Sequence, residues 1–83
     1  MNKVLISVFV PVLGRTFDMF IPLQSPMTEV LDLIKKAVTE LSDGRFTADR
    51  DTVLCHQEDG TIININLSVY ELEIRNGCKL MLI

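Results

Sequence analysis

The segment from Leu72 to Leu82, "LEIRNGCKLML", decides the fold of this chain of 83 residues. It contains an Asn76-Gly77 dipeptide, which favours a tight turn because glycine tolerates a positive φ at little cost. After the turn, Leu80 and Leu82 are two residues apart, and this spacing predicts a final strand over residues 78–83. A closing strand needs a sheet to join, so its partner strands must lie earlier in the chain.

Two partner strands are predicted at the start of the chain, over residues 4–10 and 16–21, because both stretches have the period of two that is typical of strands. Between them, Pro11 cannot donate to a strand ladder and Gly14 can take a positive φ, which predicts a hairpin. The residues that share the expected core-facing parity are Val4, Ile6, Val8, Phe17, Met19 and Ile21, together with Leu80 and Leu82 of the final strand.

The segment 25–44, "SPMTEVLDLIKKAVTELSDG", changes to a helical period. Ser25 is expected to be the N-cap, Pro26 the first helical residue, and Gly44 the residue just past the end. The polar side of this helix carries both charge signs, which favours packing on a sheet over lying on a membrane surface. The apolar stripe consists of Met27, Val30, Leu31, Ile34, Val38 and Leu41.

The remaining segments complete a recognisable order of elements. A short strand over 52–56, a turn at "QEDG" and the stretch "TIIN" predict a second hairpin, and residues 65–77 predict a compact loop with a helical turn. This order predicts an α+β β-grasp, in which the last strand inserts parallel to the first. We expect one domain over residues 1–83, with a mixed sheet of four to five strands and one main helix packed on one face.

Composition and charge exclude several functions. The net charge is −3 and the eight basic residues are scattered, which argues against a nucleic-acid partner because phosphate binding needs clustered Lys and Arg. No apolar run reaches the roughly 20 residues that span a bilayer, and the start of the chain lacks a signal-peptide cleavage site. We therefore expect a cytoplasmic protein with no direct membrane insertion.

No group of residues predicts catalysis, a metal or a cofactor. Cys55 and Cys78 have neither metal-ligand nor redox-motif spacing, so we expect two buried or half-buried thiols. His56 is the single histidine, and no carboxylate or thiol cluster surrounds it in sequence. The prediction is a protein that is not an enzyme, with no catalytic, metal or cofactor site.

The sheet face away from the helix is the candidate binding surface. With Val53 and Cys55 assigned to the core side, the opposite parity predicts one contiguous apolar patch, rimmed by Ser7, Asp18, His56 and Lys79. We predict that it binds a partner protein or a second copy of the chain as a homodimer. The alternative, that loops cover this face or that its apolar residues are ordinary surface scatter, stays open. The patch consists of Leu5, Phe9, Phe20, Leu54, Met81 and Ile83.

Nearly the whole chain resembles ubiquitin-like proteins, through the alternation at Phe17, Met19 and Ile21, the helix stripe and the closing segment. It looks most like the YukD/EsaB group of Firmicute type VII secretion systems, through its length, its start directly on a strand and its "xIxNGxxLxL" ending. The resemblance implies a non-catalytic, cytosolic accessory or regulatory subunit. Its expected partners are the membrane ATPase or other subunits of the secretion machine.

The end of the sequence bears on a second function. Ubiquitin-type conjugation and sulfur transfer both use a flexible C-terminal Gly-Gly, whereas this sequence ends on the bulky Ile83 in an expected strand. A modifier or sulfur-carrier relative that lacks Gly-Gly is therefore a less favoured alternative. A generic β-grasp adaptor unrelated to secretion also stays open.

Overall fold

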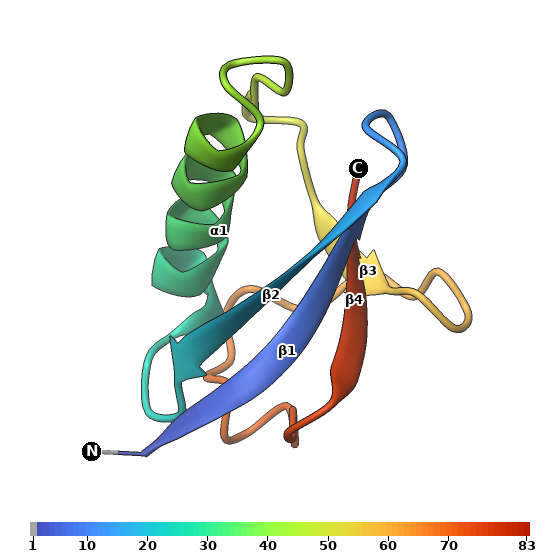
Figure 1. Ribbon diagram of the computed structural model, residues 1–83. Coiled ribbons are helices and arrows are strands. Elements are labelled where there is room, and N and C mark those ends of the chain that lie inside the picture. Colours follow the sequence, from blue (N-terminus) through green and yellow to red (C-terminus); the bar gives the residue numbers. More distant parts are fainter. Residues whose placement is uncertain (1) are drawn as a thin grey trace.

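The computed structural model describes residues 2–83, which form a four-stranded mixed sheet with one helix across one face (Figure 1). The strand order is β2-β1-β4-β3, with β4 parallel to β1 and the other two pairs antiparallel. This is the α+β β-grasp that the sequence predicts. The elements are β1 (Lys3–Val10), β2 (Arg15–Pro22), α1 (Met27–Leu41), β3 (Leu54–His56) and β4 (Cys78–Leu82).

Strands β1 and β2 form the predicted hairpin and pair over their whole length, from Lys3 opposite Pro22 to Val10 opposite Arg15. The connecting turn closes with a hydrogen bond from Leu13 N to Val10 O at 3.0 Å. Gly14 takes a φ of 61° there, a conformation that glycine reaches without the strain a Cβ would add. Each strand is longer than predicted at its free end.

The Asn76-Gly77 turn fixes how β4 joins the sheet. Gly77 takes a φ of 87° and its N–H donates to Leu5 O at 2.8 Å, while Asn76 Oδ1 accepts the Leu5 N–H at 2.8 Å. The turn is thus bonded to β1 just before β4 begins. The resulting parallel register places Ser7 opposite Lys79 and Phe9 opposite Met81.

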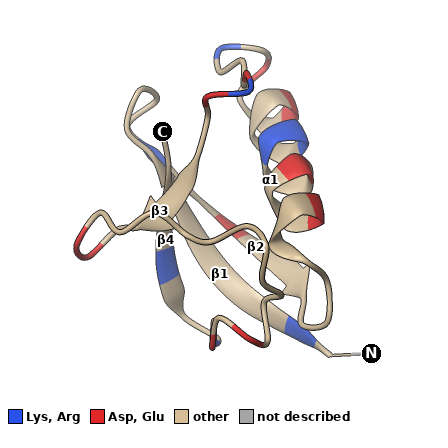
Figure 2. Ribbon diagram, turned by 180° about the vertical axis from the view of Figure 1, so that it is seen from behind, with Lys and Arg blue, Asp and Glu red and all other residues tan. Residues whose placement is uncertain are grey.

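The core lies between the sheet and α1, and it confirms the predicted core-facing parity of β1, β2 and β4. Three side chains of the segment between β3 and β4 complete it, because this segment crosses the sheet on the helix side (Figure 2). Leu41 is an exception to the predicted helix stripe and is 56% exposed, as the last residue of α1. The fully buried or nearly buried core residues include Val4, Ile6, Val8, Phe17, Ile21, Met27, Ile34, Val38, Ile63, Val69, Ile74, Leu80 and Leu82.

The start of α1 differs from the prediction. Pro26, and not Ser25, is the N-cap, and among residues 2–83 no side chain caps the helix. The backbone of the later loop takes this role, because Met27 N donates to Leu67 O at 2.9 Å. A second bond, from Val69 N to Ser25 O at 3.1 Å, holds the loop beside the helix start. A tertiary contact therefore satisfies the helix terminus that a Ser hydroxyl would otherwise serve. The predicted stop is confirmed at Gly44, whose φ is 77°.

Strand β3 is shorter than predicted, and its core-facing residue belongs to the parity that was predicted to face outward. Leu54 lies opposite Leu82 and is 1% exposed in the core, whereas Cys55 lies opposite Met81 on the other face. The assignment of Leu54 to the outer patch is therefore wrong, as is the core-facing assignment of Val53 and Cys55. Both parities are apolar here, so alternation alone could not choose between them, and the larger Leu54 fills the core.

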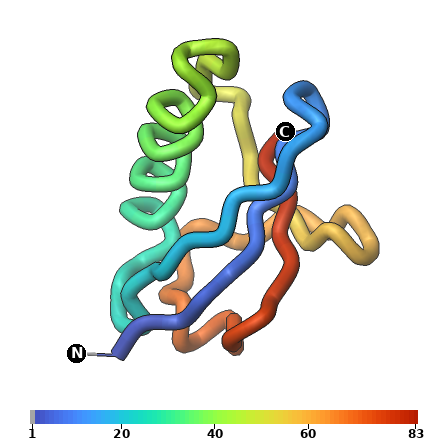
Figure 3. The backbone as a smooth tube through the Cα atoms, in the orientation of Figure 1, coloured from blue at the N-terminus to red at the C-terminus, as the bar shows by residue number. Residues whose placement is uncertain are grey.

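The predicted second hairpin is reduced to a single bridge between Cys55 and Ile62. Two backbone hydrogen bonds flank this bridge, from His56 N to Thr61 O and from Ile63 N to Leu54 O, both at 2.9 Å. Within residues 2–83 the sheet therefore has four strands, and the 61–63 segment flanks the free edge of β3. Figure 3 traces this path, in which the segment leaves the sheet edge and returns under it toward the Asn76-Gly77 turn.

Candidate protein-binding face

The sheet face away from α1, here called the outer face, carries the residues of odd number on β1. Because Ile6 and Val8 are fully buried, their neighbours Leu5, Ser7 and Phe9 point to the opposite side. Within residues 2–83, no other segment of the chain crosses this face, which is turned toward the viewer in Figure 1. The helix and the segment that crosses the sheet between β3 and β4 lie on the other side (Figure 2).

The strand register arranges the outer residues in rows that cross the sheet, named here after their β1 member. The Phe9 row consists of Thr16, Phe9, Met81 and Cys55. The Ser7 row consists of Asp18, Ser7 and Lys79. The Leu5 row consists of Phe20 and Leu5.

The Ser7 row is polar and divides the face. Ser7 Oγ donates to Asp18 Oδ1 at 2.9 Å, and Lys79 lies on the other side of Ser7. The prediction of one contiguous apolar patch is therefore wrong, since it considered the apolar residues without the row that runs between them. The face instead has two apolar clusters: the Leu5 cluster, formed by Leu5 and Phe20, and the Phe9 cluster, formed by Phe9, Met81, Val53 and Ile83.

The last pair of the Phe9 cluster extends the ladder between β3 and β4. Ile83 N donates to Val53 O at 3.0 Å, and Val53 N donates to Ile83 O at 2.8 Å. Because the preceding pair, Leu54 and Leu82, is buried in the core, Val53 and Ile83 belong to the outer face.

The two clusters are open to solvent. Phe20 is 65% exposed, Ile83 53% and Leu5 37%, while Phe9 and Met81 are half-buried. The described loops therefore leave Phe20, Ile83 and Leu5 open to solvent, which argues against the alternative in which loops cover this part of the face. Of the six predicted patch residues, five lie on the outer face and Leu54 does not.

Cys55 lies on the outer side of β3 yet is fully buried, and its Sγ is 3.5 Å from Met81 O. Burial raises the pKa of this thiol above its ordinary value, and the Asp59 carboxylate raises it further. Burial also raises the pKa of Cys78, which is half-buried. Both cysteines are free, as predicted, and both favour the protonated thiol, which is a poor nucleophile.

The other polar groups do not converge on this face. His56 lies opposite Leu80, whose side chain is in the core, so His56 is on the helix side of the sheet at its β3 edge. It is therefore not on the rim of the outer face, where it was predicted. The Thr61 N–H donates to Asp59 Oδ1 at 2.9 Å and holds the pKa of that carboxyl below its ordinary value, which is a local turn interaction. Among residues 2–83, no three His, Cys, Asp or Glu side chains come together as potential metal ligands.

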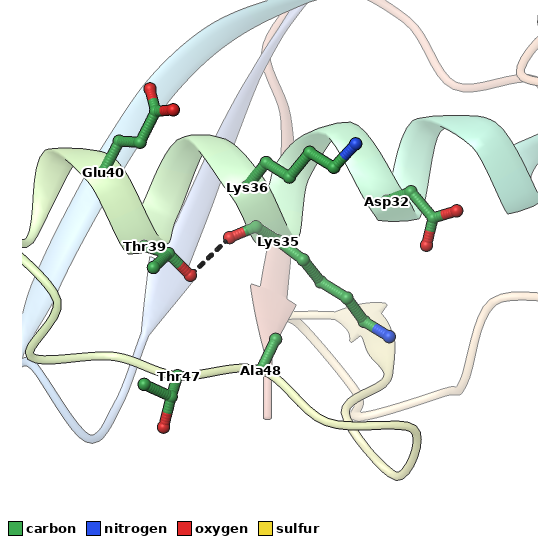
Figure 4. A pocket seen from close by; sticks show the side chains of 7 residues that line it. All are labelled: Asp32, Lys35, Lys36, Thr39, Glu40, Thr47 and Ala48. Carbon is green, nitrogen blue, oxygen red and sulfur yellow. Dashed lines mark hydrogen bonds between the residues drawn. The ribbon is translucent and has the colours of Figure 1, made fainter.

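A shallow groove of about 480 Å³ lies between α1 and the loop at Thr47 and Ala48 (Figure 4). Its lining carries both charge signs, and two of its polar groups are already bonded locally. Thr39 Oγ1 donates to Lys35 O at 2.8 Å, and Lys35 Nζ donates to Asp49 O at 3.1 Å. Glu40 and Lys36 point away from the loop side of the groove in Figure 4. The charged groups of the groove therefore do not converge on one point where a ligand could bind.

Comparison with solved structures shows a ubiquitin-like fold. The EccD5 ubiquitin-like domain from Mycobacterium xenopi has a TM-score of 0.82 and 22% identity, over all of this chain and 94% of that one. The ubiquitin-like domain of the Mycobacterium tuberculosis type VII secretion system protein EccD1 has a TM-score of 0.79 and 17% identity, over all of this chain and 99% of that one.

Similar domains also occur inside larger chains. A chain of the MycP5-free ESX-5 inner membrane complex has a TM-score of 0.72 and 18% identity, with all of this chain matching 21% of that one. No protein-family model and no curated protein sequence matches this chain. Of residues 2–83, no helix has the length and apolar composition needed to cross a membrane.

Proposed function

We propose that this chain is a non-catalytic protein-interaction module of a type VII secretion apparatus, and that it works through the outer face of its sheet. The observation that carries the proposal is the pair of exposed apolar clusters on a face that residues 2–83 leave uncovered. Exposed apolar surface of this kind is costly in water unless a partner covers it. The clusters therefore favour binding over chemistry.

The secretion context is supported by the structural neighbours. Two of them are ubiquitin-like domains of EccD proteins, and another belongs to an ESX-5 inner membrane complex. By analogy, the partner of this chain is a subunit of such a membrane complex, either the membrane ATPase or a protein beside it. The proposed location is the cytoplasm, as an accessory or regulatory subunit of the YukD/EsaB group.

The absence of catalysis is part of the proposal. Burial raises the pKa of both thiols and so favours their protonated form. His56 lies on the opposite face of the sheet from Cys55. A nucleophile needs an adjacent base within hydrogen-bond reach. The polar residues of the outer face, Ser7, Asp18 and Lys79, are assigned to recognition.

The test is capture of partners from the native cell with Phe20→Ser and Met81→Ser, one substitution in each cluster. Each removes exposed or half-exposed apolar surface without opening the core, so the fold should be retained and partner capture should fall at least tenfold. Leu33→Ser is the matched control, because Leu33 is 53% exposed on α1, away from the outer face. Unchanged capture by both sheet variants would contradict the proposal.

A further inference from the structure

We propose that the outer face binds a second copy of this chain across a two-fold axis that runs parallel to the strands and passes by Ser7. The inference rests on the proposed function only in taking the outer face as the binding surface. It names the occupant of that surface from the charges of the Ser7 row.

The Ser7 row has opposite charges at equal distances from its centre. Asp18 on β2 and Lys79 on β4 are both direct neighbours of Ser7 on β1, and both are exposed. Neighbouring strands are about 4.8 Å apart, so the two charges stand about 10 Å from each other, one on each side of β1. When the row is turned around so that its β2 end takes the place of its β4 end, the negative charge of Asp18 therefore takes the place of the positive charge of Lys79.

This pattern is complementary to itself in one orientation. When two outer faces meet across an axis parallel to the strands, the β2 side of one copy faces the β4 side of the other. Asp18 then faces Lys79 of the second copy, and the same pair repeats on the other side of the axis. An axis in the interface but perpendicular to the strands would place Asp18 against Asp18 and Lys79 against Lys79, which is repulsive.

The same axis also matches the apolar clusters. It leaves positions along the strands unchanged, so Phe9 faces Phe9 and Leu5 faces Leu5 of the second copy. The two ion pairs then lie between two apolar contacts that exclude water from them. Sheets that pack face to face keep their strands roughly aligned and about 10 Å apart, which agrees with this arrangement.

The area of the outer face determines how strongly the two copies are expected to bind. The four strands have 8, 8, 5 and 3 residues, which at about 3.3 Å per residue and about 4.8 Å between strands give a face of about 400 Å² per copy. That is below the size of a standard specific interface, so the dimer should be weak, reversible and dependent on protein concentration. The helices remain on the outside of the dimer.

Charge reversal tests the pairing directly. Asp18→Lys makes both ends of the row positive, and Lys79→Asp makes both ends negative. Each variant alone faces its copy with like charges, so its dimer dissociation constant should rise at least about tenfold over the wild type in analytical ultracentrifugation at low salt. An equimolar mixture of the two variants restores both ion pairs and should form a heterodimer at least as readily as the wild type forms its homodimer.

Controls come from α1, where Glu40→Lys and Lys36→Asp make the same changes of net charge on exposed residues outside the row. Both should dimerise as the wild type does. A wild type that stays monomeric at millimolar concentration, or a mixture that gives no heterodimer, would overturn the second-copy proposal. A monomeric wild type that still captures a cellular partner through Phe20 and Met81 would overturn this inference and leave the proposed function standing.

Discussion

At the scale of single residues, Glu73 shows backbone strain outside any regular element. Its φ is 56°, in the left-handed region, where a residue with a Cβ pays roughly 1 kcal/mol. Its side chain is exposed, so Glu73→Gly should remove the strain and raise the free energy of unfolding by about 0.5–1 kcal/mol. Urea unfolding measures this change, and a lower stability of the variant would refute the argument.

Gly77→Ala is the opposite change and serves as its control. Gly77 has a φ of 87°, and an added Cβ would meet no atom within 4 Å. Any loss of stability would therefore come from the backbone alone, and about 1–2 kcal/mol is expected.

Asn76 has a structural role that its position in a turn does not reveal. Its Oδ1 accepts the Leu5 N–H at 2.8 Å, across 71 residues of sequence. Asn76→Ala should lower the free energy of unfolding by about 0.5–1.5 kcal/mol, because one hydrogen bond is lost at an exposed site. Asn76→Asp keeps the acceptor and should keep most of the stability, and equal losses in both variants would contradict this role.

Cys55 should make stability depend on alkaline pH. Folding raises the pKa of its thiol above the ordinary value of 9.0, so the native state holds the proton more tightly than the unfolded chain. Its contribution to stability is complete below pH 9 and is lost as the pH rises through the folded-state pKa. Above pH 9 the free energy of unfolding of Cys55→Ala should therefore fall less steeply than that of the wild type, and parallel curves would argue against a raised pKa.

At the scale of elements, the orientation of β3 decides which residues reach the partner. Leu54 is 1% exposed in the core, whereas Val53 is half-buried on the outer side. Leu54→Ala should cost about 2–4 kcal/mol of stability, and Val53→Ala less than about 1 kcal/mol. Thermal or urea unfolding compares the two, and a larger loss at Val53 would mean that the strand is turned the other way.

The sequence predicted the elements well where one parity or one face was clearly apolar. In β1 both parities carry apolar residues, but only the other parity includes a polar one, Ser7, and Val4, Ile6 and Val8 were assigned correctly to the core. The core stripe of α1 was clear except at Leu41. In β3 both parities were apolar, so the pattern carried no information and the choice was wrong. The prediction of Ser25 as the N-cap was wrong for another reason. The Leu67 carbonyl that accepts the Met27 N–H comes from a loop that is distant in sequence.

The candidate face was predicted in composition but not in layout. Five of the six patch residues lie on it, since the alternation of β1, β2 and β4 was correct. The division by the Ser7 row needed the register, which places Asp18 and Lys79 on either side of Ser7. Register depends on the lengths and bonds of the turns, and the Asn76 bond to β1 had no signal in the sequence.

At the scale of the whole molecule, residues 2–83 cover one face of the sheet and leave the other bare. The helix and all the loop contributions to the core are on one side, so the opposite face keeps its apolar side chains in solvent (Figures 1 and 2). The central claim is that this bare face is where the protein meets its partners. Both the secretion proposal and the second-copy proposal depend on it.

Site-specific photo-crosslinking in the native cell tests this claim most directly. A photoreactive residue in place of Phe20 or Ile83 would probe the outer face, and one in place of Leu33 or Tyr70, both more than half exposed elsewhere on the surface, would serve as the control. We expect crosslinked protein adducts from the two sheet positions and none from the other two. Adducts at Leu33 or Tyr70 with none at Phe20 and Ile83 would contradict the account.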